Sequence, residues 1–251
     1  MTETLPPAGI DLFDARRLRF SEIEPPHQSA EDVAARDRVW ETAVRANPTL
    51  FDGPVVACGG IDWADPHVLD VTWARVTYRH YALRRVPGAT AMGSLFVNVV
   101  QPTVDGRVAV VRMAPSTAAP GRWQLPGGSV EPPPHGSALD AANVAAQAAR
   151  ELSEEMGIDV SGEDLELCVV TRGENTSVGL TYLAPARPEG DLREAFATAA
   201  RAERAKGLEP ELAELTLVNS PDDLGELAGP HADYLAPIVA RCTHTPRRQL
   251  T

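Results

Sequence analysis

The first half of the chain alternates apolar and polar residues over several short stretches. This period of two is typical of β-strands that bury one face. It predicts strands over residues 18–23, 55–58, 68–81, 92–100 and 107–112. Ser29 to Asn47 instead carries apolar residues at helical spacing, with Ser29 placed to cap the helix and Pro48 to end it. Asp105-Gly106 predicts a hairpin that pairs the last two of these strands.

The second half adds longer helices to the strands. An alanine-rich helix is expected from about Asp140 to Met156, with Gly157 as its left-handed C-cap. Further strands are predicted over 123–125, 165–171, 179–183 and 214–218, and further helices over 192–205, 221–227 and 232–241. The mixture predicts an α+β fold with a central mixed sheet and helices on its faces.

The charge and the cysteine content of the chain indicate which binding partners and which cellular compartment to expect. The chain has 23 basic and 35 acidic residues, a formal net charge of −12. Such a surface repels phosphate backbones, so nucleic acid is not an expected partner. The three cysteines form no C-x-x-C pair, and no signal peptide or run of about 20 apolar residues is seen. We therefore expect a cytoplasmic protein that does not bind membranes.

Three carboxylates stand together near the end of the alanine-rich helix. Glu151, Glu154 and Glu155 are three or four residues apart, so they share one face. They repel one another and oppose the negative end of the helix dipole. A hard divalent cation such as Mg²⁺ or Mn²⁺ would relieve that repulsion. The alternative is a solvated acidic face with an ion pair between Arg150 and Glu154.

Paired glycines in a loop just before this helix favour the metal interpretation. Gly127 and Gly128 permit positive φ and close backbone approach, which a loop around a phosphate–metal cluster needs. The whole pattern, Gly-Gly, then Glu, then R-E-L-x-E-E-x-G and an aliphatic residue, resembles the Nudix box. The match covers Gly128, Glu131, Arg150, Glu151, Leu152, Glu154, Glu155, Gly157 and Ile158. One family position differs, because Ala142 stands where a Glu is expected, and the loop from Glu131 to Arg150 is longer than the family's.

The resemblance implies a fold and a reaction. The fold is an α/β/α sandwich around a mixed sheet, and the reaction is attack of water on a nucleoside diphosphate linked to another group. It implies that Glu151 and Glu155 are the principal ligands of Mg²⁺ or Mn²⁺, and Glu154 a further or water-mediated one. It also implies that Arg150 orients these catalytic glutamates by ion pairing. The protein is expected to be a monomer or a homodimer.

The N-terminal extension resembles a Nudix subgroup that hydrolyses UDP-glucose and UDP-galactose to UMP and a hexose 1-phosphate. The shared features are a Trp-bearing helix followed by N-P-x-L-F-x-G (38–54), the stretch Thr77-Tyr78-Arg79-His80-Tyr81, and A-P-G (119–121). We expect an N-terminal extension over 1–90, packed on a Nudix hydrolase domain over 91–242, and a flexible tail over 243–251. Tyr78 or Trp123 could stack on the uracil, and Arg112 could bind a phosphate. The expected substrate contacts are Gly127, Gly128, Glu131, Arg112 and Tyr78.

Two other readings remain open. The substrate could be another nucleoside diphosphate derivative or nucleotide, such as ADP-ribose, a dinucleotide or a damaged nucleotide. The Ala142 departure could also indicate a degenerate box that only binds a ligand. The intact glutamate triad favours catalysis, because a pure binding module has no need of three repelling carboxylates.

Overall fold

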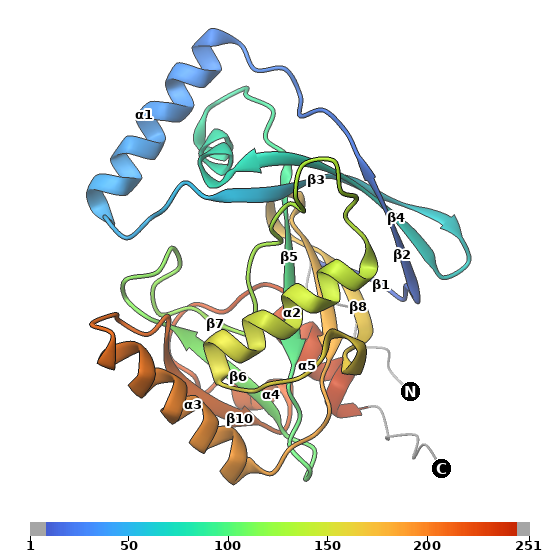
Figure 1. The fold of residues 1–251 in the computed structure, drawn as a ribbon, viewed down its shortest axis with the longest axis vertical. Helices are drawn as coiled ribbons and strands as arrows, with labels where there is room; N and C mark the ends of the chain where they lie inside the picture. The colour runs from blue at the N-terminus through green and yellow to red at the C-terminus, as the bar shows by residue number, and fades with distance from the viewer. Residues whose placement is uncertain (1–8, 245–251) are drawn as a thin grey trace.

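The computed structural model describes residues 9–244 (Figure 1). The elements of its N-terminal part are β1 (Asp11–Phe13), β2 (Arg17–Glu22), α1 (Ala30–Ala46), β3 (Pro54–Asp65), β4 (Val68–Thr77) and the 3₁₀-helix η1 (Tyr78–Arg85). Next come β5 (Gly93–Val100), β6 (Val108–Met113), β7 (Trp123–Gln124), α2 (Ala141–Met156), η2 (Gly162–Asp164), β8 (Glu166–Arg172), η3 (Glu174–Thr176) and β9 (Val178–Leu183). The chain continues through α3 (Glu189–Ala205), β10 (Leu212–Val218), α4 (Pro221–Leu224) and α5 (Leu235–His244). No helix within residues 9–244 has the length and apolar character needed to cross a bilayer.

Across residues 9–244 the strands form two sheets. One has seven strands in the order β1-β8-β9-β5-β3-β4-β2, and the other has three in the order β10-β6-β7. The β2–β4 and β5–β9 pairs are parallel, whereas the remaining pairs are antiparallel. The seven-stranded sheet is therefore mixed, because it contains both parallel pairs. The predicted α+β class is confirmed.

Strand β5 separates two hydrophobic layers because its side chains alternate between them. Leu95, Val97 and Val99 pack into the cluster that contains the apolar side of α2. Val100 packs on the opposite side, in the cluster that contains Leu235 of α5. Helices thus cover both faces of the central strands, as in the expected α/β/α sandwich (Figure 1).

Helix α2 forms as the sequence predicts. Asp140 caps it and exchanges hydrogen bonds with Asn143, and Gly157 ends it with a φ of 67°. Ala148 and Leu152 are fully buried on the side that packs against β5. This packing fixes the direction in which the polar face of the helix points.

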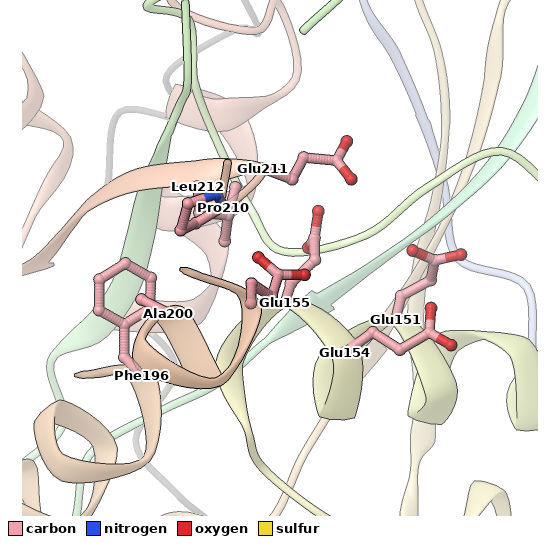
Figure 2. A pocket seen from close by; sticks show the side chains of 9 residues that line it. Glu151, Glu154, Glu155, Phe196, Ala200, Pro210, Glu211 and Leu212 are labelled. Atoms are coloured by element: carbon pink, nitrogen blue, oxygen red, sulfur yellow. The ribbon is translucent and has the colours of Figure 1, made fainter. Parts of the chain in front are cut away.

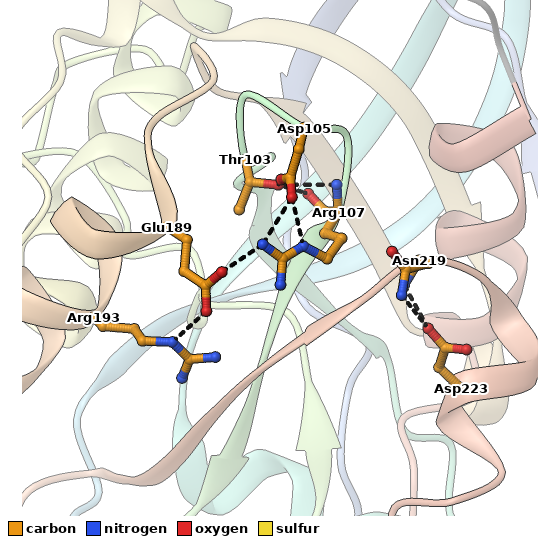
Figure 3. A network of polar contacts seen from close by, with 7 residues as sticks. All are labelled: Thr103, Asp105, Arg107, Glu189, Arg193, Asn219 and Asp223. Carbon is orange, nitrogen blue, oxygen red and sulfur yellow. Dashed lines mark hydrogen bonds and ion pairs between the residues drawn. The ribbon is translucent and has the colours of Figure 1, made fainter.

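The predicted hairpin between β5 and β6 forms only next to its turn, where Pro102 pairs with Val108 and the amide of Ala109 donates to the carbonyl of Gln101. The Asp105-Gly106 turn does form, and Arg107 joins it to Glu189 of α3 with a 2.5 Å ion pair (Figure 3). Beyond that turn the strands diverge: β5 pairs with β9 and β3, and β6 with β10 and β7. The reason is that another segment takes the edge of β5. The amides of Val97 and Val99 donate to the carbonyls of Gly128 and Pro126, at 2.9 Å each.

The strand predicted over 68–81 ends earlier, at Thr77. Its last ladder partner is Pro54, the first residue of β3, so no strand remains for later residues to pair with. Tyr78 instead donates its amide to Gly53, and Arg79 donates to the carboxylate of Asp52 at 2.8 Å. The chain then turns into η1.

Some predicted boundaries shift. Helix α3 begins at Glu189 rather than 192, and α4 ends at Leu224 rather than 227. Helix α5 begins at Leu235 and runs to His244, so it includes two residues of the predicted tail. The rest of that tail, 245–251, and residues 1–8 of the extension lie outside the described residues.

Candidate active site

The end of α2 forms one wall of a cavity of about 170 Å³ (Figure 2). The opposite wall comes from α3 and from the segment that leads into β10. The lining residues are Glu151, Glu154, Glu155, Phe196, Ala200, Glu203, Pro210, Glu211 and Leu212. Five of these described residues are glutamates and none is basic, so the cavity is strongly acidic.

The Gly-Gly loop closes against the same end of α2. The amide of Gly127 donates to Glu155 Oε2 at 2.7 Å. Gly128 lies so near Glu151 that a Cβ at this position would stand 2.7 Å from its carboxyl group. The loop and two of the three predicted glutamates therefore form one assembly.

Only glycine can occupy the first of these loop positions. Gly127 has a φ of 149°, in the region that side chains other than glycine rarely adopt. A Cβ there would also overlap the backbone of Val97 and Asn98 in β5. Close backbone approach at Gly127 is what lets the loop occupy the edge of β5.

Burial and mutual repulsion dominate the electrostatics of the cavity. Burial raises the pKa of Glu155 well above its usual range, and the charges of Glu211 and Glu151 add to this. Burial raises the pKa of Glu151 to about 7, although Arg150 opposes the shift. The pKa of Glu211 is also raised, first by desolvation of its carboxyl in the cavity wall. No positive side chain offsets the raised pKa of Glu155 or of Glu211.

Arg150 contacts several of the glutamates from the solvent side. Its Nη2 lies 3.1 Å from Glu131 Oε1 and 3.8 Å from Glu151 Oε1, and its Nε lies 4.0 Å from Glu154 Oε1. The side chain is 40% exposed, so each pair contributes little to stability. The arrangement brings Arg150 and Glu131 beside the triad.

The donor set of the cavity suits a hard divalent cation. All its charged groups are carboxylates, the oxygen ligands that Mg²⁺ and Mn²⁺ prefer. Within the described chain no three His, Cys, Asp or Glu side chains are already drawn together as a metal-binding cluster. Cation binding would offset the repulsion that raises the carboxyl pKa values, so the residues fit the group chemically.

Comparison with known proteins identifies the family. A model of the NUDIX domain matches residues 95–242, which is more than half of the chain. The chain belongs to the Nudix family. It is a Nudix hydrolase, and enzymes of this family generally use divalent metal ions and small nucleotide derivatives. No curated protein matches the chain.

Several solved structures of the family are distantly similar. A MutT protein from Methanosarcina mazei is 18% identical over 55% of this chain and 83% of its own, with a TM-score of 0.36. A MutT NUDIX hydrolase from Burkholderia pseudomallei is 20% identical over 60% of this chain and 97% of its own, with a TM-score of 0.36. The NUDIX domain of Shewanella oneidensis NrtR, in complex with ADP ribose, is 16% identical over 65% of this chain and 95% of its own, with a TM-score of 0.39. With TM-scores this low, the family assignment depends on the domain match.

Glu211 joins the Nudix-box glutamates from outside the box. It directly precedes β10, and its carbonyl accepts a 2.8 Å hydrogen bond from the amide of Ala114. The structure places its carboxyl in the wall opposite Glu155 (Figure 2). The sequence carries no signal for this role, because a lone Glu before a strand is typical of a solvated surface.

The structure does not bring Arg112 to the glutamates. Arg112 alternates with Val111 and Met113, which pack toward α2, so its side chain lies on the other face of β6. There its Nη1 is 3.6 Å from Glu214 Oε2, and its guanidinium lies 5.8 Å from the ring centroid of Trp123. Trp123 is 2% exposed and is a core residue, so it offers no free ring face to a base.

Tyr78 lies in an aromatic group of the N-terminal extension. Its ring centroid is 6.2 Å from that of Trp40 and 5.6 Å from that of Tyr81. Burial raises the pKa of Tyr78, the charges of Arg122 and Arg84 oppose this, and Glu211 adds to it. The structure therefore places Tyr78 among the aromatic rings of the extension and not among the residues that line the cavity.

Ala142 lies in the first turn of α2 and is exposed. It is nine residues from Glu151, which corresponds to about 13 Å along a helix. The family's missing glutamate therefore belongs to a position away from the cavity, and its absence leaves the lining carboxylates unchanged.

Proposed function

We propose that this Nudix hydrolase is a metal-dependent pyrophosphohydrolase of a UDP-glucose-like nucleotide sugar, with UMP and a sugar 1-phosphate as products. The observation that carries the proposal is the acidic cavity at the end of α2, where the Gly-Gly loop contacts Glu151 and Glu155. The choice of substrate rests on the sequence of the N-terminal extension and on its contacts beside that cavity.

Each side chain of the cavity has a proposed part in the reaction. Glu151, Glu154 and Glu155 hold Mg²⁺ or Mn²⁺, and Glu211 faces them from the opposite wall. When bound, the metal neutralises phosphate oxygens and lowers the pKa of water. Arg150 keeps the glutamates oriented, and the Gly127 amide holds one Glu155 oxygen at 2.7 Å.

The size of the cavity supports a diphosphate as the group bound there. At about 170 Å³ it is smaller than the roughly 300–1,000 Å³ that whole small-molecule ligands occupy. A nucleotide sugar would therefore place its diphosphate in the cavity and extend its nucleoside and sugar over neighbouring surface. Glu131, beside Arg150, and Tyr78, in the N-terminal extension, are proposed contacts on that surface.

The N-terminal extension is tied to the segment that leads to the cavity. Asn47 Nδ2 donates to the carbonyls of Ser116 and Thr117, at 2.9 Å and 3.0 Å. Two residues earlier, Ala114 is bonded to Glu211. We propose an extension over 1–90 and a catalytic domain over 91–242, packed on each other through these contacts.

A substrate panel tests the proposal. Purified protein with Mg²⁺ is given UDP-glucose, UDP-galactose, ADP-glucose, ADP-ribose, a dinucleotide and nucleoside triphosphates, and products are identified by mass. ADP-glucose is the matched control, because it differs from UDP-glucose only in the base. We expect UMP and glucose 1-phosphate from UDP-glucose, with no turnover in EDTA. Preferred cleavage of another substrate would overturn the UDP-sugar assignment and keep the Nudix chemistry, whereas turnover in EDTA would overturn the metal assignment.

A further inference from the structure

Gln147 lies on the same face of α2 as the charged residues of the site. Arg150, Glu151 and Glu154 follow it by three, four and seven residues, which is the spacing of side chains along one side of a helix. Gln147 is half-buried and occupies none of the matched positions of the Nudix box. A polar side chain one turn before Arg150 therefore calls for an explanation of its own.

The Gln147 side chain binds both backbone groups of Glu131. Its Oε1 accepts from the Glu131 amide at 2.7 Å, and its Nε2 donates to the Glu131 carbonyl at 3.1 Å. The two bonds repeat the pattern of a hydrogen-bonded β-ladder pair, with a side-chain amide in place of a neighbouring strand. They fix the peptide groups on both sides of the Glu131 Cα, and hence the direction in which its side chain leaves the backbone.

Glu131 lies at the point where the chain leaves the sheet. The residue before it, Val130, is fully buried and is hydrogen-bonded through its amide to β5 and through its carbonyl to β3. After Glu131 the lengthened loop runs through three prolines, and Arg75 of β4 donates to the carbonyl of Pro133. Glu131 thus connects a segment held by the sheet with one held by the extension, and Gln147 ties it to α2.

The carboxylate of Glu131 is linked to the cavity glutamates through Arg150. One guanidinium nitrogen, Nη2, lies 3.1 Å from Glu131 Oε1 and 3.8 Å from Glu151 Oε1. Arg150 therefore bridges the two carboxylates and lies nearer to Glu131. If Glu131 swung away into solvent, the guanidinium would close on Glu151. It would then occupy an oxygen that a cation needs, because an arginine and a metal ion compete for the same carboxylate lone pairs.

We propose that Gln147 is a positioning residue for metal binding: by fixing Glu131 it keeps Arg150 shared between two carboxylates and so leaves Glu151 open to Mg²⁺ or Mn²⁺. The inference rests on the proposed assignment of the metal to the box glutamates and on no particular substrate. The Gln147 amide is neutral, so its effect on the cation comes from geometry and not from charge. The lengthened loop thereby takes part in the site, since it begins at the residue that Gln147 holds.

Titration of Mn²⁺ into the substrate-free protein, followed by calorimetry, tests the inference without turnover. We expect Gln147→Met, which keeps the length of the side chain and changes no charge, to weaken Mn²⁺ binding by about 3- to 10-fold, the amount that one or two hydrogen bonds contribute. Gln28→Met is the matched control, because half-buried Gln28 also donates to two backbone carbonyls, those of Pro26 and Thr90, but lies in the extension. This control should bind Mn²⁺ as the wild type does.

The same comparison in an Arg150→Met background separates the proposed bridge from a general effect on the loop. Without the guanidinium nothing closes on Glu151, so adding Gln147→Met should then change Mn²⁺ affinity by less than about twofold. Kinetics on whichever nucleotide derivative the wild type cleaves give the second readout. With Arg150 present, Gln147→Met should raise the Mg²⁺ concentration for half-maximal turnover by about 3- to 10-fold, while kcat at saturating Mg²⁺ stays within about twofold.

The possible results distinguish the inference from the proposed metal site. Wild-type Mn²⁺ affinity in Gln147→Met, or an equal loss with and without Arg150, would overturn the inference and leave the metal assignment standing. Absence of Mn²⁺ binding by the wild type would overturn the proposed metal site itself, and the inference with it.

Discussion

The Nudix-box cavity and the N-terminal extension contribute to this enzyme in opposite ways. The cavity is lined by carboxylates that repel one another, and they are held in position by α2 and the Gly-Gly loop. The extension offers aromatic rings and arginines, and its helix α1 has no fully buried residue. The difference shows that the spacing of residues along one helix is enough to define the Nudix box. The extension, in contrast, acts only through contacts with distant segments that form on folding. We accordingly expect changes in the box to lower kcat and changes in the extension to alter substrate affinity and preference.

The largest effect is expected from Glu155→Gln. The change keeps shape and the acceptor for the Gly127 amide but removes a metal-binding charge, so kcat should fall by more than about 100-fold. The metal-free variant should melt at a higher temperature than the wild type, because it lacks one repelling, buried carboxylate. Activity assays and thermal unfolding in EDTA check both parts. Normal turnover at limiting Mg²⁺ would refute the metal assignment.

A large effect is also expected from Gly128→Ala. Its Cβ would lie 2.7 Å from the Glu151 carboxyl, so either the loop or the glutamate must shift. A small displacement in an active site lowers kcat by about 100-fold. Gly190→Ala is the control, since a Cβ there meets nothing within 4 Å. Equal kcat for the two variants would show that the contact between loop and helix is unimportant.

Asn47→Asp should have a moderate effect on stability and on KM, and it tests the role of the extension apart from that of the box. The variant loses the two Nδ2 donations to Ser116 and Thr117 but keeps an oxygen for the Thr49 amide. Loss of these bonds should cost about 1–3 kcal/mol in unfolding free energy, measured by urea denaturation, and raise KM more than it lowers kcat. A fall in kcat with unchanged KM would contradict the proposed division of roles.

The smallest effect is expected from Ala142→Glu, which restores the residue usual in the family. The position is exposed and away from the cavity, so turnover should stay within about twofold of the wild type. Steady-state kinetics of the two proteins side by side are sufficient. An inactive wild type rescued by this change would show that the box is degenerate.

The sequence predicts the box better than its surroundings for a physical reason. Helix α2, its caps and the shared face of Glu151, Glu154 and Glu155 depend on neighbours within a few residues. The hairpin is shorter than predicted because Pro126 and Gly128, far along the chain, take the hydrogen-bonding edge of β5.

Glu211 and Arg112 show that the sequence also fails to predict side-chain positions in the site that depend on distant strand pairing. Glu211 reaches the cavity only because β10 pairs with β6, which no local pattern encodes. Arg112 was expected beside the substrate, but the pleat of β6 directs it to the Trp123 face. A shift of one residue in a strand reverses the face of a side chain, so sequence alone does not fix such positions.

One comparison tests the central claim most directly: kcat and KM of Glu155→Gln and Tyr78→Ala, each on UDP-glucose and ADP-glucose with Mg²⁺. We predict that Glu155→Gln lowers kcat on both substrates and keeps the wild-type preference. Tyr78→Ala should lower the preference for UDP-glucose and retain most of kcat. Loss of kcat on both substrates in Tyr78→Ala, with an unchanged preference, would contradict the account that the Nudix box performs the chemistry and the extension selects the substrate.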